Sequence, residues 1–127
     1  MVSFERTKLP DWGIINASKE EWDAIKDLIA HVAQPEIFGG SGLDIMSGME
    51  YEDWLSWNMK FSEDRYKDVP PQIIHRSELH VIFMTACNAI DAKVQGLTEE
   101  HWGIIGEINK HKMSEAVECG QEDSGQY

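Results

Sequence analysis

The sequence is poor in cysteine. Its 127 residues include only two, Cys87 and Cys119. Small secreted domains that depend on disulfides usually carry roughly four to eight closely spaced cysteines. We therefore expect two free thiols in a reducing compartment and no disulfide framework.

Long apolar runs are also missing. No segment approaches the ~18 consecutive apolar residues that a membrane-spanning helix needs. Residues 1–6 lack the apolar stretch of a secretory signal peptide. These absences predict a cytoplasmic protein without a membrane partner.

Basic residues are scarce. The chain has 11 Lys and Arg against 23 Asp and Glu, which gives a formal net charge of −12. Affinity for nucleic acid comes mainly from Lys and Arg that displace counterions from phosphates, and anionic membranes attract the same side chains. The charge therefore argues against both as direct ligands. Hydrophobic residues make up 42% of the chain, and this content argues against a disordered protein.

Helix caps and apolar periodicity predict an all-α domain over residues 1–117. Ser18 and Glu21 have the spacing of a capping box, Ser47 and Glu50 repeat it, and Thr98 is a third candidate cap. The four predicted helices span about 18–33, 48–66, 71–95 and 98–116. Residues 1–16 are expected to form an irregular arm, or a short strand around residues 13–15. A glycine-rich connector joins the first two helices, and residues 118–127 form a flexible acidic tail.

Two arrangements of polar residues suggest metal binding. His75, Glu78 and His80 are close enough in sequence to share a metal, although hydrogen-bonded packing is the alternative interpretation. Asp27 with His31, and Glu107 with His111, each have i, i+4 spacing. A helical wheel places both of these pairs opposite the apolar stripe, so we expect solvated ion pairs.

No catalytic signature is present. The chain has no Gly-x-Ser-x-Gly elbow and no spaced phosphate-binding glycine motif. We therefore expect neither an enzyme nor a bound cofactor.

The acidic residues are unevenly distributed. From Asp27 to Met59 the chain has no Lys or Arg, and aromatic residues are interleaved with the acids. Aromatic anchors beside acidic groups are suited to a basic protein partner, because charge steers the encounter and buried aromatics hold the complex. An ordinary acidic face with its tryptophans in the core is the alternative. The predicted partner-binding residues are Asp44, Glu50, Tyr51, Glu52, Asp53, Trp54 and Trp57.

The leading functional hypothesis is a small, non-enzymatic interaction protein. It would bind, and inhibit or regulate, a larger protein with a basic surface. If that surface normally binds nucleic acid, the acids would take the place of phosphates, a strategy that fits a phage or mobile-element protein. The alternatives are a small helical enzyme that depends on a metal or ligand, and a homo-oligomeric ligand-binding bundle.

Overall fold

The computed structural model describes residues 1–63, 66 and 73–117. In chain order, its elements are β1 (Ser3–Arg6), β2 (Trp12–Asn16), α1 (Lys19–Val32), α2 (Pro35–Gly40), α3 (Leu43–Ser47), α4 (Tyr51–Lys60), β3 (Ile73–His75), α5 (Arg76–Asp91), α6 (Glu99–Ile108) and α7 (Met113–Ala116).

The prediction of an all-α domain is wrong, because the described residues also form a three-stranded antiparallel sheet. The strand order is β1-β2-β3, with Phe4 opposite Ile15 and Gly13 opposite Ile74. The sheet includes most of residues 1–16, which were expected to form an irregular arm or a short strand around residues 13–15. The short strand is confirmed as part of β2. Asp11 ends the β1–β2 loop with a φ of 69°, a conformation that Asp tolerates better than most residues.

The predicted first helix is confirmed as α1. Ser18 is its N-cap: the Glu21 amide donates to Ser18 Oγ at 3.1 Å, and the Ser18 amide donates to Glu21 Oε1 at 2.8 Å. Thr98 caps α6 in a similar way, with His101 as the reciprocal partner. Both helix starts therefore follow from local side-chain chemistry.

The segment before α4 is not a simple connector. Pro35 occupies the first turn of α2, where its missing amide breaks no helical hydrogen bond, and α3 begins after residues 41 and 42. The predicted helix over 48–66 is shorter and begins after Glu50. Ser47 is not its cap, because its hydroxyl instead donates to the Leu43 carbonyl at 2.7 Å.

The last two predicted helices are also divided. Within the 71–95 segment, β3 precedes α5, while residues 71 and 72 lie outside the described part of the chain. The 98–116 segment forms α6 and α7, separated by residues 109–112. The predicted tail over 118–127, with Cys119, is outside the described residues.

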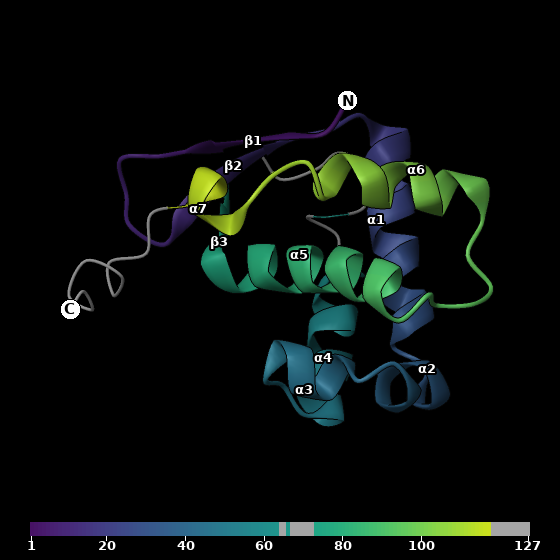
Figure 1. Ribbon diagram of the computed structural model, residues 1–127. Helices are drawn as coiled ribbons and strands as arrows, with labels where there is room; N and C mark the ends of the chain where they lie inside the picture. The colour runs from purple at the N-terminus through teal and green to yellow at the C-terminus, as the bar shows by residue number, and fades with distance from the viewer. Residues whose placement is uncertain (64–65, 67–72, 118–127) are drawn as a thin grey trace.

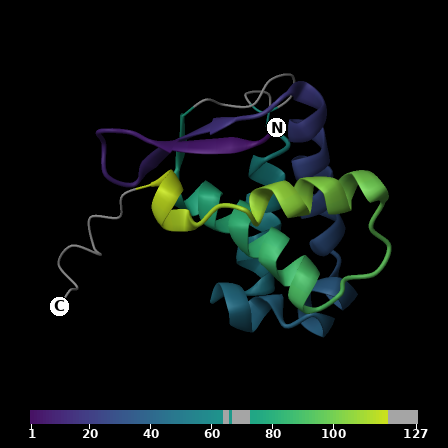
Figure 2. The same cartoon turned by 45° about the horizontal axis from the view of Figure 1, so that its top comes forward.

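Helix α5 is the central element. It contacts α1, α3, α6, α7, β2 and β3. The sheet and α7 lie on one side of α5, while α2, α3 and α4 lie on the opposite side (Figure 1). Figure 2 shows α6 crossing over α5. Trp22, Trp54 and Tyr66 are the largest fully buried side chains of the core. This arrangement places α2, α3 and α4, which contain Asp44, Glu52 and Asp53, on the side of α5 opposite the sheet.

Candidate functional site

An open groove lies at the α2–α4 end of the molecule. Its volume is about 760 Å³. Four of the predicted partner-binding residues line it: Asp44, Glu50, Tyr51 and Glu52. The remaining lining residues are Pro35, Phe38, Gly39, Ile45, Gly48 and Met49. The short helices thus bring together residues that lie on both sides of a glycine-rich segment.

Aromatic packing holds one wall of the groove. The Tyr51 hydroxyl donates to the Ala33 carbonyl at 2.7 Å, which ties α4 to the end of α1. The Tyr51 ring packs against Phe38, with ring centroids 5.4 Å apart. Ile45, by contrast, is 84% exposed. The groove therefore has a fixed aromatic wall and an apolar side chain accessible to a partner.

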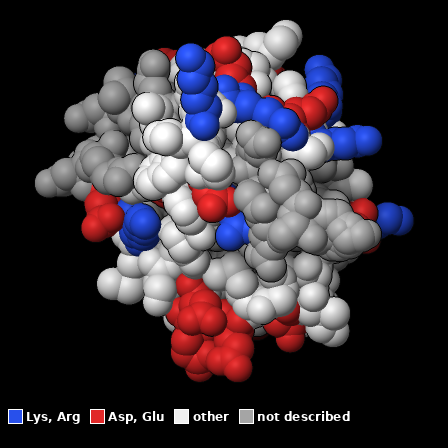
Figure 3. Space-filling view, turned by 90° about the vertical axis from the view of Figure 1, so that its left-hand side faces the viewer, with Lys and Arg blue, Asp and Glu red and all other residues white. Residues whose placement is uncertain are grey.

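Negative charge surrounds this groove. Asp44, Glu50 and Glu52 are exposed, and Asp53 is exposed in the first turn of α4. None of these four carboxylates forms an ion pair with another described residue. Figure 3 shows Asp and Glu side chains gathered at the lower end of the molecule, with no Lys or Arg beside them. These four carboxylates thus form an acidic surface with no ion-pair partner among the described residues.

The two tryptophans of α4 have different environments. Trp54 is 0% exposed and packs against Phe38, with ring centroids 5.6 Å apart. Trp57 is half-buried, and Lys60 Nζ lies 4.6 Å from its ring centroid. Trp54 is therefore a core residue, whereas Trp57 remains accessible at a second cavity.

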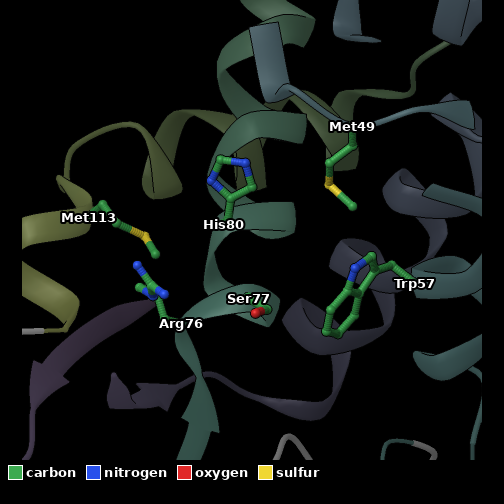
Figure 4. A pocket seen from close by; sticks show the side chains of 6 residues that line it. All are labelled: Met49, Trp57, Arg76, Ser77, His80 and Met113. Carbon is green, nitrogen blue, oxygen red and sulfur yellow. The ribbon is translucent and has the colours of Figure 1, made fainter. Parts of the chain in front are cut away.

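This second cavity has a volume of about 340 Å³. Six side chains line it: Met49, Trp57, Arg76, Ser77, His80 and Met113 (Figure 4). Met49 also lines the acidic groove, so the two depressions adjoin. Arg76, Met49 and Met113 carry no recognisable sequence motif. Sequence reasoning missed them because Met49, Arg76 and Met113 lie far apart in the sequence and line one cavity only in the folded chain.

The three candidate metal ligands are engaged in hydrogen bonds within the fold. His75 caps α5: its Nδ1 accepts from the Ser77 amide at 3.1 Å, and its own amide donates to Glu78 Oε1 at 2.9 Å. His80 Nε2 donates to the Ser47 carbonyl at 3.0 Å. Within the described residues, no group of three or more His, Cys, Asp or Glu side chains is placed to hold a metal ion.

The expected Asp27–His31 ion pair is replaced by a contact between helices. Asp27 Oδ2 lies 2.6 Å from Nε2 of His101 on α6, and His31 Nε2 instead contacts the Gln95 carbonyl at 2.8 Å. Glu107 likewise does not pair with His111, since its Oε1 accepts from the Val2 amide at 2.9 Å. These polar groups join segments distant in sequence, a role that i, i+4 spacing does not reveal.

The Cys87 thiol is predicted to react slowly. Burial, together with the charge of Asp91, raises the pKa of this thiol, and its Sγ lies 3.8 Å from Asp91 Oδ2. Because the thiolate is the nucleophile, alkylation by iodoacetamide at pH 8 should be severalfold slower than for a free cysteine. In a Cys119→Ser background, the pH profile of the rate should be displaced to higher pH. Asp91→Asn should move the profile part of the way back, because burial is the larger cause of the raised pKa and remains in this variant. An unchanged profile in Asp91→Asn would contradict the role of Asp91.

Comparisons with known proteins do not assign a family. No family model, curated protein or solved structure matches the chain. No helix among the described residues is long and apolar enough to cross a bilayer.

Proposed function

We propose that this protein is a small interaction protein that binds a larger protein through the acidic groove. The partner presents a basic surface, and binding inhibits or regulates that partner. The observation that carries this proposal is the combination of uncompensated carboxylates with an exposed apolar side chain at one groove. An acidic patch alone would be only a solvated surface, whereas this one borders apolar surface that a partner would bury.

Charge supplies the first part of recognition. Asp44, Glu50 and Glu52 border the groove without an ion-pair partner among the described residues. Like charges held close together raise the local negative potential, which accelerates encounter with a basic surface and disfavours acidic proteins. Salt screens such exposed charges, so association should weaken as ionic strength rises.

Apolar contact supplies the second part. Ile45 and Met49 can be buried by a partner, while the Tyr51–Phe38 pair gives a wall that is already ordered. A pre-ordered wall reduces the conformational entropy lost on binding. The matching surface on the partner is a segment in which Lys or Arg residues flank an apolar side chain. Where those basic groups normally hold phosphates, the groove would compete with nucleic acid.

The test compares two charge-reversed variants. Asp44→Lys/Glu52→Lys removes acids from the groove, whereas Glu99→Lys/Glu100→Lys makes the same change in net charge at the exposed first turn of α6. Affinity capture from the native host, with wild-type protein as bait, identifies the partner. The purified pair is then measured by titration at low and high salt.

The groove variant should weaken binding by about tenfold or more at low salt, and the α6 variant by much less. Ile45→Ser should weaken binding with little change in its salt dependence, because it removes apolar contact and leaves the charges in place. Equal losses of affinity in the two charge variants, or an affinity that does not change with salt concentration, would contradict a specific acidic docking site.

A further inference from the structure

The cavity beside the groove has the dimensions and lining of a small-molecule site. Its volume of about 340 Å³ falls at the small end of the range for ligand pockets, roughly 300–1,000 Å³. Figure 4 shows Trp57 and Met49 on one side, Arg76 and Met113 on the other, and His80 and Ser77 between them. Such a site is mostly apolar and has a few polar groups that converge on one space.

The apolar part is suited to a flat or branched hydrocarbon group. Trp57 presents an indole, which packs well against the face or the edge of another aromatic ring. Met49 and Met113 add polarizable thioethers that adapt to irregular shapes and make favourable contacts with aromatic rings. These three side chains come from different segments of the chain, so only the folded protein forms the apolar wall.

Arg76 supplies a positive charge at the other side of the cavity. Its Nε lies 3.3 Å from Asp11 Oδ1, and its backbone amide donates to the Asp11 carbonyl at 2.8 Å. These contacts anchor the side chain near the cavity. Asp11 approaches the guanidinium most closely at Nε, and the two Nη groups form no hydrogen bond with a described residue. A guanidinium with free Nη donors pairs well with a carboxylate, which accepts two parallel hydrogen bonds.

His80 and Ser77 provide hydrogen-bond acceptors between the two ends. His80 Nε2 donates to the Ser47 carbonyl, so Nδ1 of the neutral ring is an acceptor. His75 Nδ1 accepts from the Ser77 amide and therefore carries no proton, so the Ser77 hydroxyl, 3.2 Å away, can only share the same lone pair. The Ser77 oxygen keeps lone pairs available. A ligand with a hydroxyl or amino group near its carboxylate would satisfy these acceptors.

We propose that this cavity binds a small carboxylate with an apolar, preferably aromatic, body. Arg76 pairs with the carboxylate, while Trp57, Met49 and Met113 enclose the body. The proposal does not rest on the proposed function, because it concerns a different ligand and its test requires no protein partner.

The test uses three probes that share one aromatic body. 3-Phenylpropionate carries the carboxylate, 3-phenylpropionamide replaces it with a neutral amide, and phenethylamine carries the opposite charge. Binding is followed by the indole N–H resonance of Trp57, assigned with Trp57→Phe. The carboxylate should bind with a dissociation constant on the order of 1 mM or below. The amide should bind about tenfold more weakly, and the amine should not shift the resonance.

Two variants test the role of the guanidinium. Arg76→Gln should weaken 3-phenylpropionate binding by about tenfold, to the level of the amide. Lys110→Gln removes one positive charge from an exposed position and should have no effect. Equal binding of carboxylate and amide to the wild-type protein would overturn the proposal even if Arg76→Gln fails to fold. Preference for the amine, or no binding of any probe, would also overturn it.

Discussion

Replacing Trp54 with alanine should lower the free energy of unfolding by about 3–5 kcal/mol, the usual cost of truncating a large buried aromatic residue. The side chain is fully buried and packs against Phe38, while α4 contacts both α1 and α2. Removing it leaves a cavity where these three helices meet. Urea unfolding followed by circular dichroism measures the change.

Trp57→Ala is the matched control on the same helix. Trp57 is half-buried at the cavity edge, so its removal should cost about 1–2 kcal/mol. Trp54→Phe should also cost less than Trp54→Ala, because it keeps most of the ring. It also removes a buried indole N–H that has no hydrogen-bond partner among the described residues. A Trp54→Ala protein as stable as wild type would instead favour the alternative in which this tryptophan is a partner anchor.

Gly13→Ala should destabilise the protein by about 3 kcal/mol or more, at or above the upper end of the usual range for overpacking. A Cβ at this position would lie 2.3 Å from the Ala116 carbonyl oxygen and 3.1 Å from Leu79 Cδ1. The first contact is with backbone, which no side-chain rotation relieves. Helix α7 would therefore have to move away from β1 and β2, which it contacts.

Gly39→Ala is the control for this substitution. A Cβ at Gly39 meets nothing within 4 Å, and the residue lies in α2, where alanine is favoured over glycine. The Gly39→Ala protein should be as stable as the wild type or more stable. Hydrogen exchange at the Val117 amide, which donates to the Met113 carbonyl, should accelerate in Gly13→Ala and stay unchanged in Gly39→Ala. Equal exchange in both variants would show that α7 does not depend on the close approach at Gly13.

Helix starts were the most predictable part of the fold. The capping box at Ser18 and the cap at Thr98 were both confirmed, since their hydrogen bonds join residues three positions apart. The same motif predicted a cap at Ser47, and that prediction is wrong, because the Ser47 hydroxyl donates to the Leu43 carbonyl inside α3. A spacing of Ser and Glu indicates that a cap is sterically feasible, but competing partners decide whether it forms.

The sheet was missed because its strands are short and its pairing is non-local. Alternation over the three residues of β3 is too brief to distinguish a strand from the start of a helix. In the fold, β3 pairs with β2, and the paired residues, such as Gly13 and Ile74, are far apart in the sequence. Its hydrogen bonds depend on where α5 and the hairpin lie, and this placement leaves no local mark in the sequence.

The acidic surface could be predicted from the sequence, whereas the cavity could not. The net charge, the absence of Lys and Arg between Asp27 and Met59, and the acids before and within α4 can all be read from the chain. These properties depend on residue type alone. Which tryptophan of α4 is buried, and which lines a cavity with Arg76, depends on how helices distant in sequence pack together. Local chemistry thus set the charge and the main helix starts, whereas long-range packing created the groove, the cavity and the sheet.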